Sequence, residues 1–144
     1  METKNIGFGI KKPKKECEDN SCPFHGSLKC RGRNFTGTVV SAKMQKTVTV
    51  EWGWKHYIKK YERYESKRSR VKAHNPSCIS ANEGDIVKII ECRPLSKTKN
   101  FVVVEILGQE KGFAQRMEAE EEARFKREAK EEEIKSDKKA EVVA

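Results

Sequence analysis

Three cysteines and one histidine near the N-terminus could together bind a metal ion. Cys17, Cys22, His25 and Cys30 fall within 14 residues of one another. Three thiolates and one imidazole are a complete tetrahedral ligand set for zinc. Their spacing, however, matches neither the Cys-x2-Cys pair of a zinc ribbon nor the order of a zinc knuckle. Two interpretations stay open: a structural zinc site, or unliganded residues of an arm that packs on the folded body or its partner.

A second group of chemically active residues runs from Lys43 to His74. It holds ten basic and only three acidic residues, interleaved with two tryptophans and three tyrosines. Cations replace the counterions that a nucleic acid releases, and aromatic rings stack on exposed bases or riboses. The alternative is that the aromatic residues belong to the core and that the basic residues are merely solvated. We expect this only of Trp52, which alternates with Val48 and Val50. We predict nucleic-acid contact by Lys43, Lys46, Lys55, Lys59, Lys60, Arg63, Lys67, Arg68, Arg70 and Lys72, with Tyr57, Tyr61 and Tyr64 available for stacking.

A shorter basic patch covers Arg93 to Lys99. Pro94 cannot extend a strand ladder and is expected to start a loop. That loop would present the hydroxyls of Ser96 and Thr98 beside Arg93, Lys97 and Lys99, a combination suited to phosphates and 2′-hydroxyls. An ordinary soluble hairpin loop remains the alternative.

Enzymatic and membrane functions have little support. His25, His56 and His74 have no nearby Ser or Asp arrangement, and no glycine loop could cradle a phosphate. The longest apolar runs fall far short of the roughly 20 residues that span a bilayer, and the N-terminus lacks the apolar segment of a secretory signal. We expect a cytosolic protein whose five cysteines stay reduced.

Composition limits the size of any core and points to the partner. The 144 residues are 37% charged and 35% hydrophobic, which favours one domain with solvated extensions. Residues 1–110 carry 22 basic and 12 acidic side chains, whereas residues 111–144 carry 9 and 10. The basic excess predicts a polyanionic partner, nucleic acid first and an anionic membrane surface second.

Hydrophobic periodicity indicates which elements position these residues. The segment 47–52 alternates strictly, with Val48, Val50 and Trp52 on one face, as expected of a half-buried strand. Residues 36–42 precede it as a hairpin partner, and 85–92 and 100–107 fit more deeply buried strands. A strand over 68–74 has a weaker pattern. About five short strands without a long helix between them favour a small barrel, an all-β fold.

The C-terminal residues have the pattern of a helix instead. Residues 112–139 are rich in Ala, Glu, Lys and Arg and lack proline. Glutamates precede basic residues by four positions at 120, 122 and 131, each pair stabilising a helix by ~0.2 to 0.5 kcal/mol. No sustained apolar stripe is present, so we predict a solvated helix and not a coiled coil.

Several runs of residues closely resemble a known family. They are Gly37-Thr-Val-Val-Ser-Ala-Lys-Met-Gln-Lys-Thr-Val-Thr-Val, Lys72-Ala-His-Asn, Gly84-Asp-Ile-Val-Lys-Ile-Ile-Glu-Cys and Arg93-Pro-Leu-Ser-Lys-Thr-Lys. Over about residues 35–107 the chain resembles the small-subunit ribosomal protein family numbered seventeen in bacteria and eleven in eukaryotes. The Cys22-Pro-Phe-His form, ahead of Arg31-Gly-Arg, is most similar to the archaeal branch.

The resemblance implies a fold, a function and a set of contact residues. The fold would be a five-stranded OB-type barrel that binds the 5′ domain of small-subunit ribosomal RNA during assembly, beside neighbouring ribosomal proteins. In that family Cys30 stands where an aliphatic residue is more usual, and the terminal helix lies outside the shared pattern. The family motif falls on Lys43, Lys46, His56, Tyr57, Lys59, Lys60, Arg68, His74, Arg93, Ser96, Lys97, Thr98 and Lys99. Arg31, Arg33 and Tyr61 complete the set of residues that we predict to bind RNA.

We therefore expect three parts: an N-terminal arm at 1–34, an OB-fold RNA-binding domain at 35–108, and a charged helix and tail at 109–144. No cofactor is expected beyond the open question of zinc. The rival function is that of a general OB-fold protein for single-stranded nucleic acids.

Overall fold

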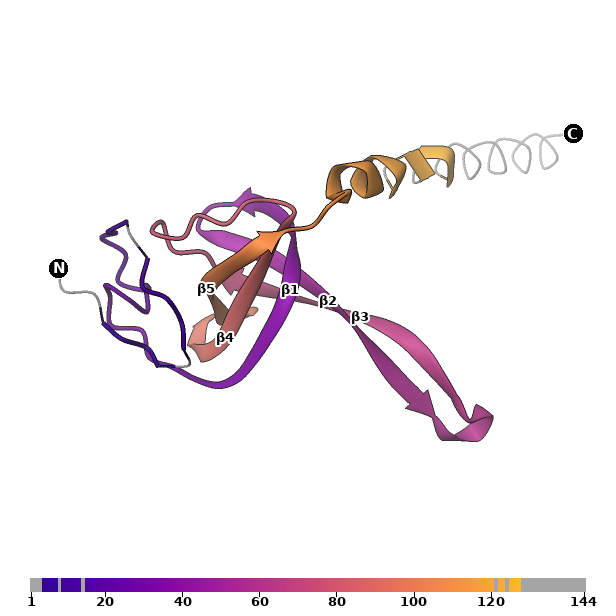
Figure 1. Cartoon of the computed structure of the whole chain (residues 1–144), viewed down its shortest axis with the longest axis horizontal. Coiled ribbons are helices and arrows are strands. Elements are labelled where there is room, and N and C mark those ends of the chain that lie inside the picture. Colours follow the sequence, from indigo (N-terminus) through magenta and orange to yellow (C-terminus); the bar gives the residue numbers. More distant parts are fainter. Residues whose placement is uncertain (1–3, 8, 14, 121, 124, 128–144) are drawn as a thin grey trace, which may run out of the picture. The chain divides into compact units, whose positions relative to one another are not determined.

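Five β-strands close into a barrel in the order β1-β2-β3-β5-β4 (Figure 1). The computed structural model describes residues 4–7, 9–13, 15–120, 122–123 and 125–127. The strands are β1 (Cys30–Met44), β2 (Thr47–Ile58), β3 (Arg63–His74), β4 (Asp85–Ser96) and β5 (Lys99–Gln109), with one 3-10 turn, η1 (Lys59–Tyr61). β3 and β5 run parallel and the other four pairings are antiparallel. The predicted five-stranded barrel is confirmed.

The barrel interior is filled by small branched side chains from all five strands. Val48 and Val50, which alternate along β2, are fully buried beside Val39, Ile89 and Val103. Side chains two apart on a strand lie on the same face, so the strict alternation in the sequence marks the inner face of β2. Trp52 is only partly buried; it packs against this cluster and stacks on Phe35 with ring centroids 4.6 Å apart.

β4 and β5 are buried on both faces, which explains their continuous apolar sequences. Val87 and Ile89 point into the barrel, whereas Ile90 and Val102 belong to a second cluster on the outside. Leu28 of the N-terminal arm is buried in that outer cluster. The arm therefore covers the outer face of the β4–β5 pair.

The arm is irregular but packed. Among the described residues before Cys30 there is no helix or strand, and turns such as the hydrogen bond from the Cys22 amide to the Asp19 carbonyl, 2.9 Å, shape the backbone instead. The predicted boundary at residue 34 lies within β1, which begins at Cys30. Residues 31–34 are polar and hold Gly32, so their own pattern does not indicate a strand. Pairing with β4 extends β1 back to Cys30, and the register of this pairing is irregular between Cys30 and Asn34.

The β2–β3 pair continues beyond the barrel as a long two-stranded ribbon (Figure 1). Twelve residue pairs, from Thr47↔His74 to Ile58↔Arg63, follow one another without a register shift. η1 and Glu62, which adopts a left-handed φ of 48°, turn the chain at the tip. β3 is thus longer than the predicted 68–74 strand, because ladder hydrogen bonds to β2 specify it where apolar burial does not.

The β4–β5 connection is tighter than predicted. Pro94 does not start a loop, since β4 continues to Ser96 and only Lys97 and Thr98 form the turn. Cross-strand pairing is interrupted between Glu91↔Phe101 and Ser96↔Lys99. Proline is tolerated in a strand where no ladder hydrogen bond needs its missing N–H, and that interruption provides such a place.

The chain after Glu110 forms a separate unit. Residues 113–120, 122–123 and 125–127 are helical, and the predicted pair Glu122–Lys126 is present at 3.6 Å. The predicted helix beyond 127, with its pair at 131 and 135, lies outside the described residues. Within the part of the chain that is described, no helix is long and apolar enough to cross a membrane.

Candidate nucleic-acid interface

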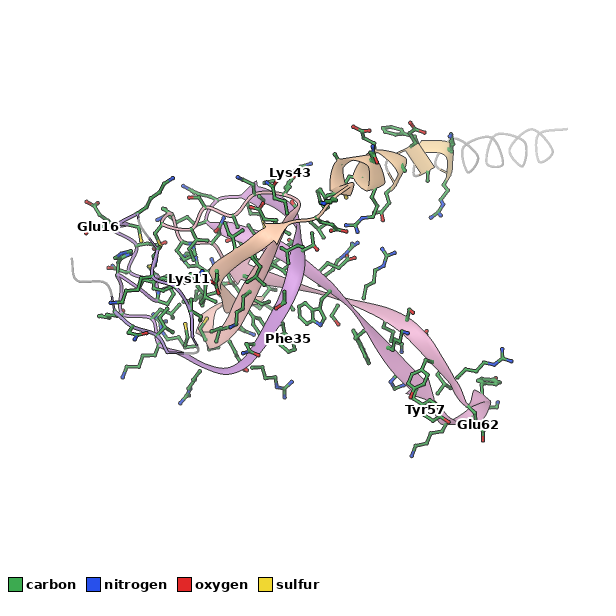
Figure 2. All side chains as sticks on the ribbon, viewed as in Figure 1. Lys11, Glu16, Phe35, Lys43, Tyr57 and Glu62 are labelled. Atoms are coloured by element: carbon green, nitrogen blue, oxygen red, sulfur yellow. The ribbon has the colours of Figure 1, made fainter. Side chains whose placement is uncertain are left out.

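The outer half of the β2–β3 ribbon presents a basic face. Partners in a strand pair point to the same side, so the register places Lys55 beside Ser66, and Arg68 and Arg70 further along the same side. All of these cations are exposed, and Lys72 continues the row. Figure 2 shows side chains standing out along the ribbon to its tip. The phosphate backbone of a nucleic acid could contact this row of basic side chains along its whole length.

Aromatic rings on the ribbon are exposed as well. Tyr57 and Tyr64 form a cross-strand pair with centroids 5.1 Å apart and remain 44% and 70% exposed. On the opposite face, Trp54 contacts the edge of His56 and donates its indole N–H to Ser69 Oγ at 2.9 Å. At the tip, Lys60 lies over the ring of Tyr61. Burying large rings normally stabilises a fold, so rings left this exposed make the ribbon a candidate contact surface.

Acidic residues position two of the arginines. The carboxylate of Glu51, only 15% exposed, forms ion pairs with Arg70 and, at 3.8 Å, with Arg68. The side chains of Arg68 and Arg70 are 66% and 58% exposed. Glu51 therefore orients both arginine side chains, and guanidinium groups are suited to binding phosphate. Lys67 pairs similarly with Glu65 at 3.2 Å.

Further predicted residues lie on the barrel. Arg31 and Arg33 are exposed on β1, and Arg93, Ser96, Lys97 and Thr98 are exposed on the β4–β5 hairpin. Lys43 and Lys46 line a hollow between the β1–β2 turn and residues 75–82. Lys99 is half-buried and donates to Thr47 Oγ1 at 3.2 Å, which leaves it a smaller contact surface than its neighbours.

Comparison with known proteins identifies the family. The family model described as ribosomal protein S17 matches residues 37–105. The small ribosomal subunit protein uS17 of Methanopyrus kandleri is 60% identical over 104 residues, 72% of this chain and 88% of that protein. The uS17 protein of Methanocaldococcus jannaschii is 56% identical over 109 residues, 76% and 93% of the two chains.

The chain belongs to the uS17 family. The predicted family is therefore confirmed, and the relatives are archaeal, as predicted for the branch. The match to the family model starts within β1 and ends within β5. The helical unit after Glu110 therefore falls outside this match.

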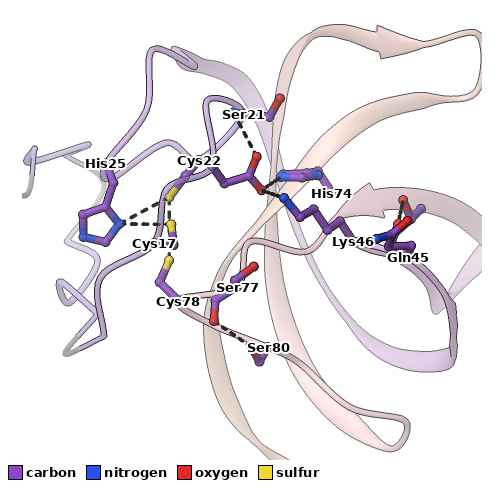
Figure 3. Close-up of polar contacts among 12 residues, drawn as sticks. Cys17, Ser21, Cys22, His25, Gln45, Lys46, His74, Ser77, Cys78 and Ser80 are labelled. Carbon is purple, nitrogen blue, oxygen red and sulfur yellow. Dashed lines mark hydrogen bonds and ion pairs between the residues drawn. The ribbon is translucent and has the colours of Figure 1, made fainter.

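His74 is one predicted contact residue that the uS17 fold uses internally. Its side chain is only 3% exposed, and its Nε2–H donates to the Asp19 carboxylate at 3.0 Å, where Lys46 also approaches to 3.7 Å (Figure 3). Burial lowers the pKa of His74 below its ordinary value of 6.5, and Lys99 adds to this, although Asp19 opposes both. Neutral His74 thus holds the arm on the end of β3, and its burial leaves little of it for a partner to contact.

This environment predicts acid sensitivity that depends on residue 74. Because the pKa of His74 is lowered in the folded state, its stabilising contribution is complete above pH 6.5 and is lost as the pH falls through the folded pKa. We expect the urea midpoint of the wild type to fall more between about pH 7.5 and about pH 5 than that of His74→Gln. Equal decreases in the two proteins would contradict a neutral, buried His74.

The cysteine cluster differs from the predicted set in one member. Cys17, Cys22 and His25 come together, but the fourth residue beside them is Cys78, from the β3–β4 connection (Figure 3). Cys30 instead lies on β1 opposite Cys92 of β4. Burial, with a smaller contribution from Cys92, raises the pKa of Cys30 to about 12, which favours the protonated thiol at neutral pH. Sequence spacing could not have indicated Cys78, which is 56 residues from Cys22.

Proposed function

We propose that this chain is a structural protein of the small ribosomal subunit and that it binds the 5′ domain of the subunit's ribosomal RNA during assembly. The relatives that it matches are named small ribosomal subunit protein uS17, and the match covers most of their length. In this role it would act in the ribosome, in the cytoplasm, beside neighbouring subunit proteins. The observation that carries the proposal is the exposed ribbon on which cations and aromatic rings stand together.

Phosphate contacts would supply most of the binding free energy. Lys55, Lys59 and Lys60 are exposed at the outer end of the ribbon. Each neutralised phosphate releases a condensed counterion, which favours binding without reading a sequence. The ribbon is narrow enough to enter between RNA helices, where the rings of Tyr57 and Tyr64 can stack on riboses or unstacked bases.

The β4–β5 hairpin would contribute a second, more directional contact. Thr98 offers a hydroxyl on the two-residue turn and Ser96 offers one at the end of β4, with Arg93 and Lys97 exposed beside them. Hydroxyls and guanidinium groups can both bond a phosphate or a 2′-hydroxyl. Because a short hairpin has little freedom to lose on binding, it is suited to fixing the barrel in one orientation.

The alternative, a general single-strand-binding protein, would use much of the same surface. OB folds bind oligonucleotides with strands 2 and 3 and with the turns between strands 1 and 2 and strands 4 and 5. Here, however, the exposed aromatic rings of the described residues before Lys111 are on the projecting ribbon, namely Trp54, Tyr57, Tyr61 and Tyr64; Phe125 of the helical unit is exposed as well. Within the described barrel, Phe35, Trp52 and Phe101 pack against the core. This distribution favours insertion into folded RNA over a stacking platform on the barrel wall.

A competition between two RNAs tests the function. The labelled 5′ domain of small-subunit RNA and a mixed-sequence single strand of equal length are titrated with the protein at about 0.15 M salt. We expect the 5′ domain to bind at least ~100-fold tighter, since specific complexes exceed non-specific ones by large factors. Equal affinities would contradict the ribosomal role. Equal affinity for a transcript of another domain of the same RNA would contradict only the 5′ assignment.

A further inference from the structure

The sulfur and nitrogen atoms at the junction of arm and barrel have the arrangement of a ligand shell. Cys17 Sγ lies 3.3 Å from His25 Nδ1, and Cys22 Sγ lies 3.6 Å from the same nitrogen and 3.6 Å from Cys78 Sγ. The four ligand atoms all fall within 4.8 Å of one another. Around a tetrahedral zinc ion with Zn–S bonds of ~2.3 Å, neighbouring sulfurs are ~3.8 Å apart and sulfur–nitrogen pairs ~3.5 Å. The three shorter separations are thus within about 0.2 Å of these edges.

The surroundings of the cluster suit a structural metal site. Cys22, His25 and Cys78 are buried, and Phe24 is 1% exposed among them. The Asp19 to Gly26 loop is tight, since a Cβ on Gly26 would lie 2.6 Å from the Asp19 carbonyl oxygen. This loop therefore holds Cys22 and His25 in a fixed arrangement away from solvent. The half-buried Cys17 and the buried Cys78 from the barrel lie next to them.

Without a metal, this arrangement is poorly compensated. Thiols are weak hydrogen-bond partners, yet they are the only polar groups that His25 Nδ1 contacts in the described chain. His25 Nε2 is buried with no hydrogen-bond partner among the described residues. A buried polar ring satisfied only by weak contacts costs free energy, and a metal–nitrogen bond would remove that cost at Nδ1.

We propose that Cys17, Cys22, His25 and Cys78 bind one zinc ion, which fastens the N-terminal arm to the β3–β4 connection of the barrel. Three thiolates and one imidazole in a closed tetrahedral shell are typical of structural zinc. The ion would join segments 56 residues apart, and such a link restricts the unfolded chain far more than a local one. It would stabilise the arm in the position where Leu28 covers β4 and β5.

A disulfide is the competing use of these thiols. All three cysteines are free, and the sulfurs of Cys22 and Cys78 are 3.6 Å apart, well beyond the ~2.05 Å of a disulfide bond. Such a bond would also leave Cys17 and His25 without a role. The zinc assignment accounts for all four side chains.

The wild-type protein provides the first test. Full-length protein is purified away from RNA under reducing conditions, and its zinc content is measured by elemental analysis, before and after incubation with zinc and removal of the excess. We expect one zinc per chain. X-ray absorption at the zinc edge should show three sulfur neighbours at ~2.3 Å and one nitrogen at ~2.0 Å. Less than about a tenth of an equivalent after incubation, or a shell of nitrogen and oxygen only, would overturn the proposal.

Two cysteine variants identify the ligands. Cys78→Ser is expected to lose stoichiometric zinc, whereas the matched control Cys30→Ser, which removes a cysteine outside the cluster, keeps one zinc per chain. The reverse result would overturn the assignment of Cys78. If circular dichroism shows that Cys78→Ser does not fold, His25→Cys is used in its place, because four cysteines still bind zinc. The X-ray absorption edge of His25→Cys should then report four sulfur neighbours. An unchanged shell of three sulfurs and one nitrogen would exclude His25 as a ligand.

Zinc binding and RNA binding can be measured independently in this protein. Zinc content is measured on RNA-free protein, so a negative result leaves the RNA competition unaffected. A failed RNA competition likewise leaves the metal content and the absorption edge unchanged.

Discussion

Replacing Lys55, Lys59 and Lys60 together with Ala is expected to weaken binding to the 5′ domain by about 10- to 100-fold at ~0.15 M salt. All three side chains are exposed at the outer end of the ribbon, beyond the interior of the barrel, so their loss removes charge without removing core. Each phosphate contact that disappears also removes a released counterion from the binding equilibrium.

Salt dependence is the measurement that isolates this effect. Dissociation constants for wild type and variant are determined across a range of salt concentrations. If all three lysines contact phosphates, the slope of log K against log salt should become smaller by about two to three. A variant that binds more weakly with an unchanged slope would show that the lysines act in some other way.

A matched control removes the same charge from the helical unit. Lys111, Lys126 and Arg127 are exposed, and their joint replacement with Ala is expected to change affinity by less than about threefold, since charges outside the interface contribute little once screened. A loss equal to that of the ribbon variant would identify the helix as a second RNA-binding element.

Gly37→Ala is the substitution with the largest expected effect on stability. Gly37 is buried on β1, and a Cβ there would lie 2.6 Å from the Glu51 carbonyl oxygen and 2.9 Å from Val50 Cγ1. The nearer atom belongs to backbone, so the β1–β2 pairing itself must shift. Such overpacking costs ~1 to 3 kcal/mol, and we expect the free energy of unfolding, measured in urea, to fall by ~2 kcal/mol or more.

Gly108→Ala is the control for this experiment. Gly108 also lies in a barrel strand, β5, but nothing is within 4 Å of the position a Cβ would take. With space available, the same substitution should be neutral or stabilise by up to ~1 kcal/mol through the lower entropy of the unfolded chain. If the two variants lose equal stability, the close approach of β1 and β2 at Gly37 does not explain the effect.

Much of the fold and the interface follows from local sequence patterns. The alternation of Val48 and Val50 marks the inner face of β2, and the apolar runs of β4 and β5 anticipate burial on both faces. The basic stretch from Lys43 to His74 can be recognised from composition alone, because its excess of basic residues is visible whatever structure the segment adopts. These features depend on residues near one another in the chain, or on composition alone.

Other features depend on contacts that a local pattern does not contain. β1 begins at Cys30 because β4 pairs with it, and Pro94 stays in β4 because the ladder is interrupted there. His74 was predicted as a contact residue, but Asp19 of the arm lies against it and the side chain is buried. Gly37 and Gly108 look alike in sequence, and only the neighbouring strand distinguishes them.

The sequence by itself determined the family, the number of strands, the basic character of the surface and the helix described between residues 113 and 127. The tertiary structure alone decided which cysteine stands beside Cys17, Cys22 and His25. Spacing within the arm favoured Cys30, but the barrel places Cys30 opposite Cys92 and brings Cys78 to the cluster. The reason is physical: periodicity reports which side of an element is buried, whereas the meeting of two distant segments depends on how the closed barrel and the arm pack together.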